Sequence, residues 1–237
     1  MNKIRISAVS YTNTKPFVFG ITHSDIINKI DLSLDIPSDC ANKLISNQAD
    51  IGLVPVAALL NIPNYEIVSD FCIGATGAVN SVFIFSDKPI EEIESIRLDT
   101  HSRTSNNLAL VLLKNYWKRS PEVVETGGDA FVLIGDRTFG TKEKYKYAYD
   151  LAEEWQNFTS LPFAFAVWAA NKPVSAEFIS EFNTALKLGL DNRLEILGDQ
   201  PLNGFDLKDY LENKLDFDLD DKKREAIKKF HSYIIAL

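Results

Sequence analysis

Short apolar runs alternate along this chain with stretches whose apolar residues recur at helical spacing. Residues 3–9 alternate and are rich in Ile and Val, which predicts a strand that begins a sheet at its edge. The elements predicted next are a helix entered through Lys15 and Pro16, a strand over 32–36, a helix from Ser38 or Asp39 to about residue 46, and a strand over 50–54 with a helix starting near Pro55. Three strand–helix units in succession predict a parallel sheet with helices on its faces.

The rest of the chain repeats this alternation. Its predicted strands are 81–86, 96–99, 130–134 and 163–169. Its predicted helices begin near residue 106 and span 150–155, and two or three amphipathic helices follow, the last capped by Asp220 or Asp221. The polar loop 100–105 lies between a strand and a helix, so it forms the N-terminal cap region of that helix.

Two apolar segments, 79–85 and 162–169, are candidates for strands that pass between two lobes. With them as a hinge, residues 1–83 and 166–237 form lobe I and residues 84–165 form an inserted lobe II. The predicted fold class is therefore α/β with two lobes, each a mostly parallel sheet flanked by helices. A ligand is expected in the cleft, where the carboxyl ends of several parallel strands point.

Composition narrows the range of partners. The 25 Lys and Arg residues face 33 Asp and Glu residues, which gives a net charge of -8 and disfavours nucleic acid and anionic membranes as partners. A small anion would have to be held by local donors such as helix N-termini, hydroxyls and amides. The first residues lack a secretion signal and no apolar run reaches membrane-spanning length, so we expect a cytoplasmic protein.

Metal and nucleophile chemistry lack their usual motifs. Two cysteines and three histidines lie dispersed along the chain, and the GxSxG, HExxH, P-loop and GxGxxG patterns are absent. We expect no metal and no cofactor. Uncharged hydrogen-bonding groups gather instead at predicted strand ends, in residues 10–14, 80–81 and 100–105, and they suit the orientation of a carboxylate or hydroxyl.

Loop 100–105 is the sharpest of these signals, because it opens a helix and offers hydroxyls, an Arg and free backbone N–H groups to an anion. Each candidate also has a purely structural interpretation. Thr104 or Ser105 could cap its own helix while Arg103 pairs with a surface acid. Residues 10–14 could form a polar turn, Asp136 could be a turn residue after Gly135, and His101 could be a solvated loop residue. The three tryptophans are expected in packing roles.

Six segments also carry a family resemblance through their order. They are VSYTNTKP at 9–16, DIGLVPV at 50–56, AVNSV at 78–82, LDTHSRTS at 98–105, LIGD at 133–136, and EEW at 153–155 followed by LPFAFAVW at 161–168. Together they resemble the chorismate dehydratase family of menaquinone biosynthesis by the futalosine pathway. Thr12 departs from the Leu usual in that family, Ala78 from its Pro, and Thr76 from a common Asp. The first two departures change packing and backbone stiffness near the cleft.

The resemblance implies a type II periplasmic-binding-protein-like fold and a hydro-lyase that removes water from chorismate to give 3-[(1-carboxyvinyl)oxy]benzoate. It implies that Asn13 and Ser81 act at the reacting end, orienting the enolpyruvyl carboxylate and the departing hydroxyl. The substrate's own enolpyruvyl carboxylate is the hypothesised proton acceptor, since the acidic ring hydrogen needs no strong protein base. The implied substrate-binding residues are Ser10, Tyr11, Ser102, Arg103, Thr104, Ser105, Gly135 and Asp136.

Two other functions remain open at this point. One is a non-catalytic protein of the same fold that binds or senses a small carboxylate. The other is a related family member that binds a later intermediate of the futalosine pathway, for which a different 10–16 motif is expected. The oligomeric state is not determined by the sequence.

Overall fold

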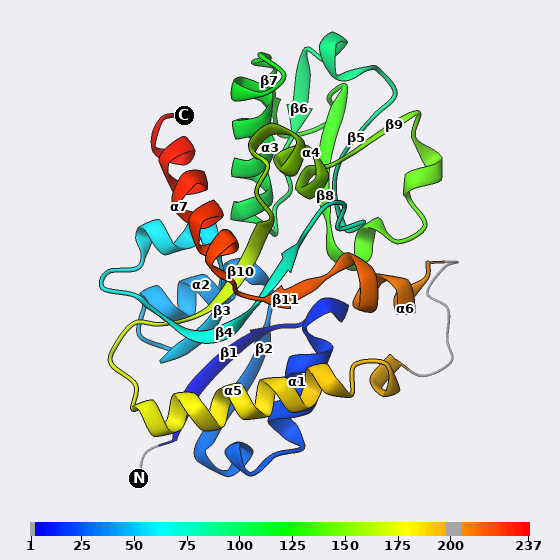
Figure 1. Cartoon of the computed structure of the whole chain (residues 1–237). Helices are drawn as coiled ribbons and strands as arrows, with labels where there is room; N and C mark the ends of the chain where they lie inside the picture. The colour runs from blue at the N-terminus through cyan, green and yellow to red at the C-terminus, as the bar shows by residue number, and fades with distance from the viewer. Residues whose placement is uncertain (1–2, 198–204) are drawn as a thin grey trace.

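Two β-sheets organise the part of the chain that the computed structural model describes, residues 3–197 and 205–237 (Figure 1). The larger sheet has the strand order β11-β4-β10-β3-β1-β2. Its strands are β1 Ile4–Val9, β2 Ile30–Asp35, β3 Ile51–Pro55, β4 Glu66–Ala75, β10 Phe163–Ala170 and β11 Asp216–Asp218. The smaller sheet has the order β7-β6-β8-β5-β9. Its strands are β5 Val82–Ser86, β6 Ser95–Arg97, β7 Glu122–Val124, β8 Ala130–Ile134 and β9 Tyr147–Asp150.

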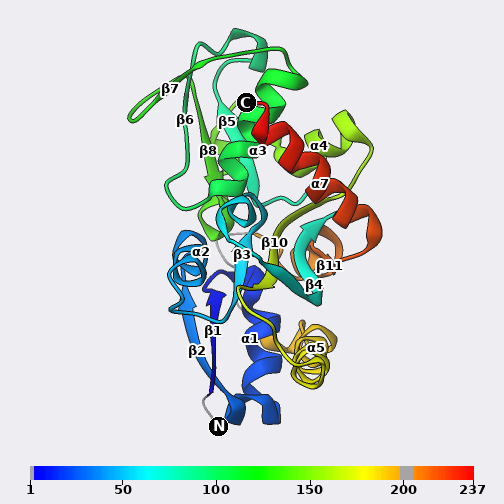
Figure 2. The same ribbon diagram turned by 90° about the vertical axis from the view of Figure 1, so that its left-hand side faces the viewer.

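Helices cover both sheets. They are α1 Lys15–Thr22, α2 Pro37–Ile45, α3 Arg103–Asn115, α4 Leu151–Thr159, α5 Ala176–Asp191, α6 Leu207–Asp209 and α7 Asp221–Ile235. Short 3₁₀ helices lie at Thr12–Thr14, Asp25–Lys29, Val56–Asn61, Ile90–Glu92, Gly135–Thr138, Lys142–Lys144 and Glu195–Leu197, and a π-helical turn at Tyr210–Lys214. Figure 2 shows the smaller sheet with α3 and α4 above the larger sheet with α1, α2 and α5. The predicted α/β architecture is confirmed.

The strand directions differ in part from the prediction. The β1–β2 and β1–β3 pairs are parallel as expected, but β10 runs antiparallel to both β3 and β4, and β11 antiparallel to β4. The smaller sheet is mixed in the same way. The predicted edge position of β1 is wrong, because β2 and β3 hydrogen-bond to its two sides, as in a doubly wound sheet.

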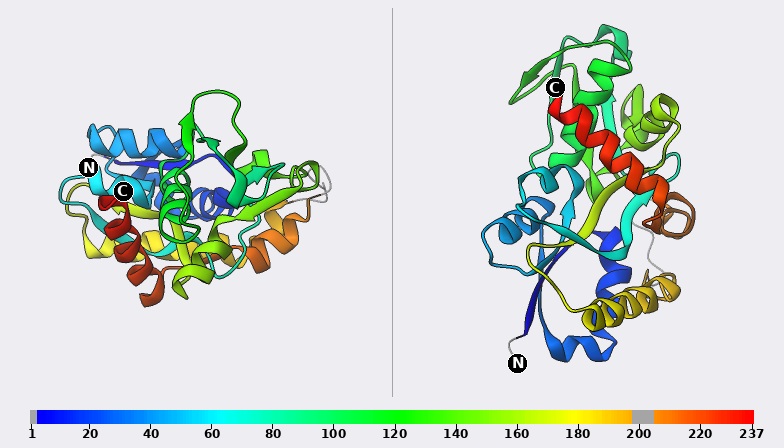
Figure 3. Two further views of the ribbon diagram at one scale, coloured as in Figure 1. Left: turned by 90° about the horizontal axis from the view of Figure 1, so that it is seen from above. Right: turned by 60° about the vertical axis from the view of Figure 1, so that its left-hand side comes forward.

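The connections between the sheets lie close to the predicted hinge. The chain leaves the larger sheet after β4, enters the smaller sheet at β5, and returns after α4 into β10. The predicted boundaries after residues 83 and 165 fall inside β5 and β10, so the exact division into lobes stays a prediction. Figure 3 shows the C-terminal helix α7 running back toward α3. α7 contacts both α3 and β10.

Helix starts differ from the prediction at two places. α2 begins at Pro37, whose fixed φ suits a first helical residue, and neither Ser38 nor Asp39 is its cap. α3 begins at Arg103, three residues earlier than predicted. The predicted cap at Asp220 is confirmed, since its side chain accepts a hydrogen bond from the Lys223 N–H.

All three tryptophans contribute to packing. Trp155 and Trp168 are fully buried, as expected, and Trp117 packs at the border of the core.

In residues 3–197 and 205–237, no helix combines the length and apolar character needed to cross a membrane. The cytoplasmic location and the exclusion of nucleic acid and membrane stay predictions.

Candidate active site

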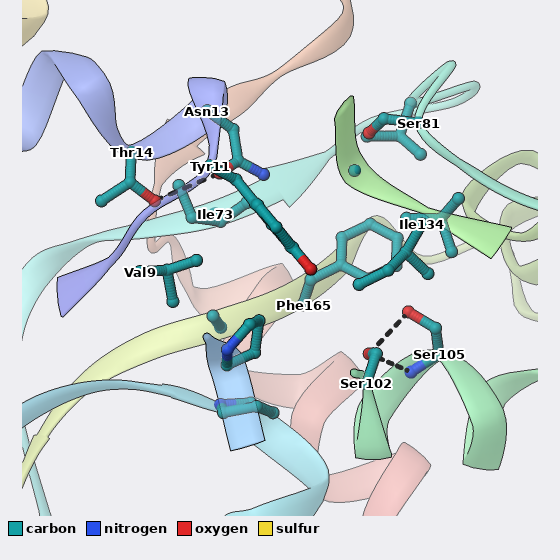
Figure 4. Close-up of a pocket in the computed structure, with 16 residues that line it drawn as sticks. Val9, Tyr11, Asn13, Thr14, Ile73, Ser81, Ser102, Ser105, Ile134 and Phe165 are labelled. Carbon is teal, nitrogen blue, oxygen red and sulfur yellow. Dashed lines mark hydrogen bonds between the residues drawn. The ribbon is translucent and has the colours of Figure 1, made fainter. Parts of the chain in front are cut away.

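A cavity lies between the two sheets, where the ends of β1, β3 and β8 face the start of α3 (Figure 4). Its empty space, including its opening to solvent, measures about 530 Å³. Its walls are largely apolar and include Val9, Pro55, Ile73, Val82, Ile134 and Phe165. Its polar lining consists of Tyr11, Asn13, Thr14, Ser81, Ser102 and Ser105. An apolar cavity with a few convergent polar groups is typical of a small-molecule site.

The cavity brings together candidates that are far apart in the sequence. Six of the predicted site residues line it, namely Asn13, Ser81, Tyr11, Ser102, Ser105 and Gly135. Figure 4 shows Asn13 and Ser81 on one side and Ser102 with Ser105 on the other. Within the described residues, no three side chains of His, Cys, Asp or Glu gather closely enough to hold a metal ion.

Asn13 is held by its neighbour. The Thr14 hydroxyl donates to Asn13 Oδ1 over 3.1 Å, which leaves the amide nitrogen of Asn13 directed toward the interior of the cavity (Figure 4). Both residues belong to the 3₁₀ helix Thr12–Thr14, which begins two residues after the end of β1 and leads into α1. The end of a parallel strand therefore places this amide at the cavity.

The turn that contains Ser81 is held by Asp150 through the backbone of the neighbouring residue, Asn80. Asp150, the N-cap of α4, accepts a hydrogen bond from the Asn80 N–H over 2.6 Å as well as from Ala152 N–H and Glu153 N–H. Asn80 has a left-handed backbone with φ of 57°, a conformation that Asn adopts more readily than most residues. Burial raises the pKa of Asp150 to about 6, although these backbone donors act in the opposite direction. Asp150 therefore anchors the turn that contains Ser81 to the start of α4.

The start of α3 presents two hydroxyls. Ser105 N–H donates to Ser102 Oγ over 3.1 Å, and Ser102 Oγ donates to Ser105 Oγ over 3.0 Å. The residue that caps the helix is therefore Ser102, rather than Thr104 or Ser105 as the structural interpretation had it. Both serines still line the cavity, next to the positive end of a helix of 13 residues.

Four predicted binding residues lie outside the cavity lining, each with a protein partner. Ser10 is exposed, and its N–H donates to Asp35 O. Thr104 Oγ1 accepts from the Ala57 N–H over 3.2 Å. Arg103 Nη2 donates to Asn42 Oδ1 over 3.0 Å, so its partner is an amide and not the surface acid considered above. The predicted substrate contacts of these residues stay predictions.

Asp136, the fourth, holds the two sides of the cavity together. Its carboxylate accepts from the Thr12 hydroxyl over 2.9 Å and from the Thr12 N–H over 3.2 Å. Asp136 follows β8 in the smaller sheet and Thr12 follows β1 in the larger one. Asp136 is thus more than a turn residue, because it joins the elements that carry Asn13 and Gly135.

Tyr11 contacts the loop before α3, which contains His101. Its hydroxyl is 3.0 Å from His101 Nδ1, and burial raises the pKa of Tyr11. A Cβ at Gly135 would come within 3.0 Å of the Tyr11 ring, and Gly135 also has a φ of 65°, so only glycine fits there without strain. Arg137 braces the same loop by donating to Asp99 over 2.7 Å.

One residue of this region was missed by the sequence reasoning. The fully buried Tyr210 donates its hydroxyl hydrogen to Ser81 Oγ over 2.9 Å, and the Asn13 side chain lies close enough to lower the pKa of that hydroxyl. Burial has the larger effect and raises the pKa of Tyr210. Nothing in the local pattern around Tyr210 distinguishes it from a packing residue.

Comparisons with solved structures define the class of protein. The fold is similar to protein AF1704 from Archaeoglobus fulgidus, with a TM-score of 0.77, 16% identity and coverage of 99% of this chain and 97% of that one. It is also similar to the Candida albicans CA3427 gene product, described as having the generic periplasmic binding protein fold, with a TM-score of 0.65, 13% identity and coverage of 100% and 91%. A third similar structure is the aliphatic sulphonate binding protein SsuA from Escherichia coli, with a TM-score of 0.60, 12% identity and coverage of 100% of this chain and 92% of that one. The chain is therefore an α/β protein of periplasmic-binding-protein-like fold.

Sequence comparison adds the family. The model of a family described as menaquinone biosynthesis matches residues 4–236, so the chain belongs to that family. A curated relative, the chorismate dehydratase of Thermus thermophilus, is 27% identical, with coverage of 82% of this chain and 83% of the relative.

Proposed function

We propose that this protein is a hydro-lyase that eliminates water from chorismate to give 3-[(1-carboxyvinyl)oxy]benzoate. Membership of the menaquinone biosynthesis family and similarity to a chorismate dehydratase support the choice of reaction. The observation that carries the proposal is the meeting of Asn13 and Ser81 at one end of an apolar cavity, with the Ser102–Ser105 pair at the other.

The lining suits this substrate chemically. Chorismate has an apolar ring face, a ring carboxylate, an enolpyruvyl carboxylate and one hydroxyl. The apolar walls fit the ring, and uncharged donors fit the two carboxylates. The ring carboxylate would lie at Ser102 and Ser105, where the positive end of α3 favours an anion. The enolpyruvyl end would lie at Asn13 and Ser81.

The reaction follows from that placement. A proton leaves the ether-bearing ring carbon, hydroxide leaves the neighbouring carbon with its bonding electrons, and the ring becomes aromatic as water forms. The substrate's own enolpyruvyl carboxylate takes the proton, while the Asn13 amide holds this side chain in the rotamer that reaches it. The Ser81 hydroxyl orients the departing hydroxyl. Loss of one such donor typically costs about 2.7–4 kcal/mol in the barrier.

The competing function is binding without turnover. It has support from the fold, since SsuA, a sulphonate binding protein, has a similar architecture. A protein of that kind would bind chorismate and release it unchanged, which separates the two functions in one assay.

The test incubates purified protein with chorismate and follows the aromatic product by mass and ultraviolet absorbance, with buffer alone as control. Asn13→Ala and Ser81→Ala are compared with Ser232→Ala, which removes an exposed hydroxyl on α7. We expect turnover in the wild type and in Ser232→Ala, and a large loss in the other two. Binding without product would favour the competing function, and undiminished turnover in both cavity variants would remove the assignment of Asn13 and Ser81.

A further inference from the structure

Tyr210 does not line the cavity itself but contacts Ser81, which does, from a segment far away in the sequence. It begins the π-helical turn Tyr210–Lys214, which follows α6, and such turns are frequent at functional sites. Its ring packs edge-on against Phe139 and Phe205, with centroid distances of 5.6 and 5.4 Å. The aromatic packing fixes the ring, and the hydroxyl meets Ser81 Oγ at 2.9 Å.

This contact determines the direction of the Ser81 hydroxyl hydrogen. A serine hydroxyl has one hydrogen to donate and two lone pairs to accept with. Tyr210 occupies one lone pair, so the Ser81 hydrogen has to point elsewhere. In the described part of the chain Ser81 Oγ donates to no protein acceptor, and Ser81 lines the cavity. Its hydrogen is therefore available to whatever occupies the cavity.

Tyr210 has a hydrogen to donate, and a phenol is a stronger acid and therefore a better donor than the aliphatic hydroxyl of a serine. Burial raises the pKa of its phenol, so the group keeps its hydrogen and remains a donor at neutral pH. Asp136 and Asp150 lie near enough to raise the pKa further, while Ser81 and Asn13 lower it. A hydroxyl that accepts a hydrogen bond becomes a better donor, because the bonds in a chain polarise one another.

We propose that Tyr210 is a positioning residue for the dehydration: by donating to Ser81, it aims the Ser81 hydroxyl at the hydroxyl that leaves chorismate. The inference rests on the proposed function. In the step, the ring C–O bond breaks and its electron pair leaves with the oxygen. Ser81 stabilises that oxygen by a hydrogen bond and keeps its own proton, while the proton from the ether-bearing carbon completes the water molecule. Tyr210 itself does not touch the substrate.

The test is Tyr210→Phe, which removes one oxygen and keeps the ring that packs on Phe139 and Phe205. We expect kcat to fall about tenfold while KM changes less than about twofold, since the lost interaction matters mainly in the transition state. Tyr149→Phe is the matched control, because it removes a tyrosine hydroxyl that accepts from the Ile90 N–H at a site outside the cavity lining.

A double-mutant cycle separates positioning from general support. In the Ser81→Ala background, Tyr210→Phe should cause no further loss of kcat, because its effect passes through Ser81. A full tenfold loss in that background would overturn the inference, as would an unchanged kcat in Tyr210→Phe alone. A fall in product affinity or a melting temperature well below that of Tyr149→Phe would assign Tyr210 to structural support and overturn it too. If the wild type does not convert chorismate, the proposed function itself has failed.

Discussion

Replacement of Gly189 by alanine tests how the framework beneath the site is built. Gly189 lies within α5, where its backbone is helical, so helix propensity alone predicts that alanine stabilises the protein by about 1 kcal/mol. The structure predicts the opposite sign. A Cβ at Gly189 would collide with Pro16 O and lie 2.8 Å from Gly20 N, both backbone atoms of α1.

The magnitude follows from what has to move. Backbone atoms cannot rotate away as a side chain can, so α1 and α5 must separate, and we assign the upper end of the usual overpacking cost, about 3 kcal/mol. The helix propensity gain of about 1 kcal/mol offsets part of it, so the net loss is about 2 kcal/mol. For a chain of this size, each kcal/mol lowers the melting temperature by roughly 2–4 °C, which predicts a decrease of roughly 4–8 °C.

Thermal unfolding followed by circular dichroism measures this shift, with Thr184→Ala on the exposed side of the same helix as control. Because Pro16 lies in the first turn of α1, the helix that follows Asn13, chorismate turnover should also fall in Gly189→Ala. A melting temperature equal to or above that of the wild type would show that the two helices do not depend on this close approach.

Three further predictions concern the cavity and its supports. Asn13→Ala and Ser81→Ala should each lower kcat by about 10²–10³-fold in the chorismate assay, and a change in KM alone would argue against transition-state roles. Thr12→Val removes the hydroxyl that donates to the Asp136 carboxylate and should lower the free energy of unfolding in urea by about 1.5–3 kcal/mol. An unchanged midpoint of urea unfolding would show that this hydrogen bond does not stabilise the fold. Asp150 has a folded pKa of about 6, above its unfolded value, so the folded state holds a proton that the unfolded chain releases. Its contribution to stability is therefore present at low pH and lost as the pH rises from about 4 to 6, which the pH profile of wild type against Asp150→Asn measures; a contribution that grows over this window would contradict the raised pKa.

Most elements were predictable because their cause is local. Strands such as β1 and β10 follow from short β-rich runs, and the start of α7 follows from a capping aspartate. β4 was missed, since its sequence EIVSDFCIGA has no clear alternation and its extended form is stabilised by pairing with β10 on one side and β11 on the other. The direction of β10 was also not predictable, because the chain returns to the larger sheet only after passing through the smaller one.

The candidate site also has one part that local pattern predicts and another that depends on the tertiary structure. Local pattern singled out the polar segments 10–14, 80–81 and 100–105, and the family resemblance selected Asn13 and Ser81 within them. The structure places Asn13, Ser81 and the start of α3 around one cavity. Local pattern gave no sign that Thr104 turns toward Ala57 or that Tyr210 meets Ser81, a residue 129 positions earlier.

The amino-acid sequence by itself determined the identity and order of the polar turns, because capping, turn chemistry and apolar periodicity act over a few residues. Only the tertiary structure decided which hydroxyls line the cavity and which are consumed by protein partners. The physical reason is that a hydroxyl has a single hydrogen to donate, and its recipient depends on whichever distant segment the fold brings within about 3 Å.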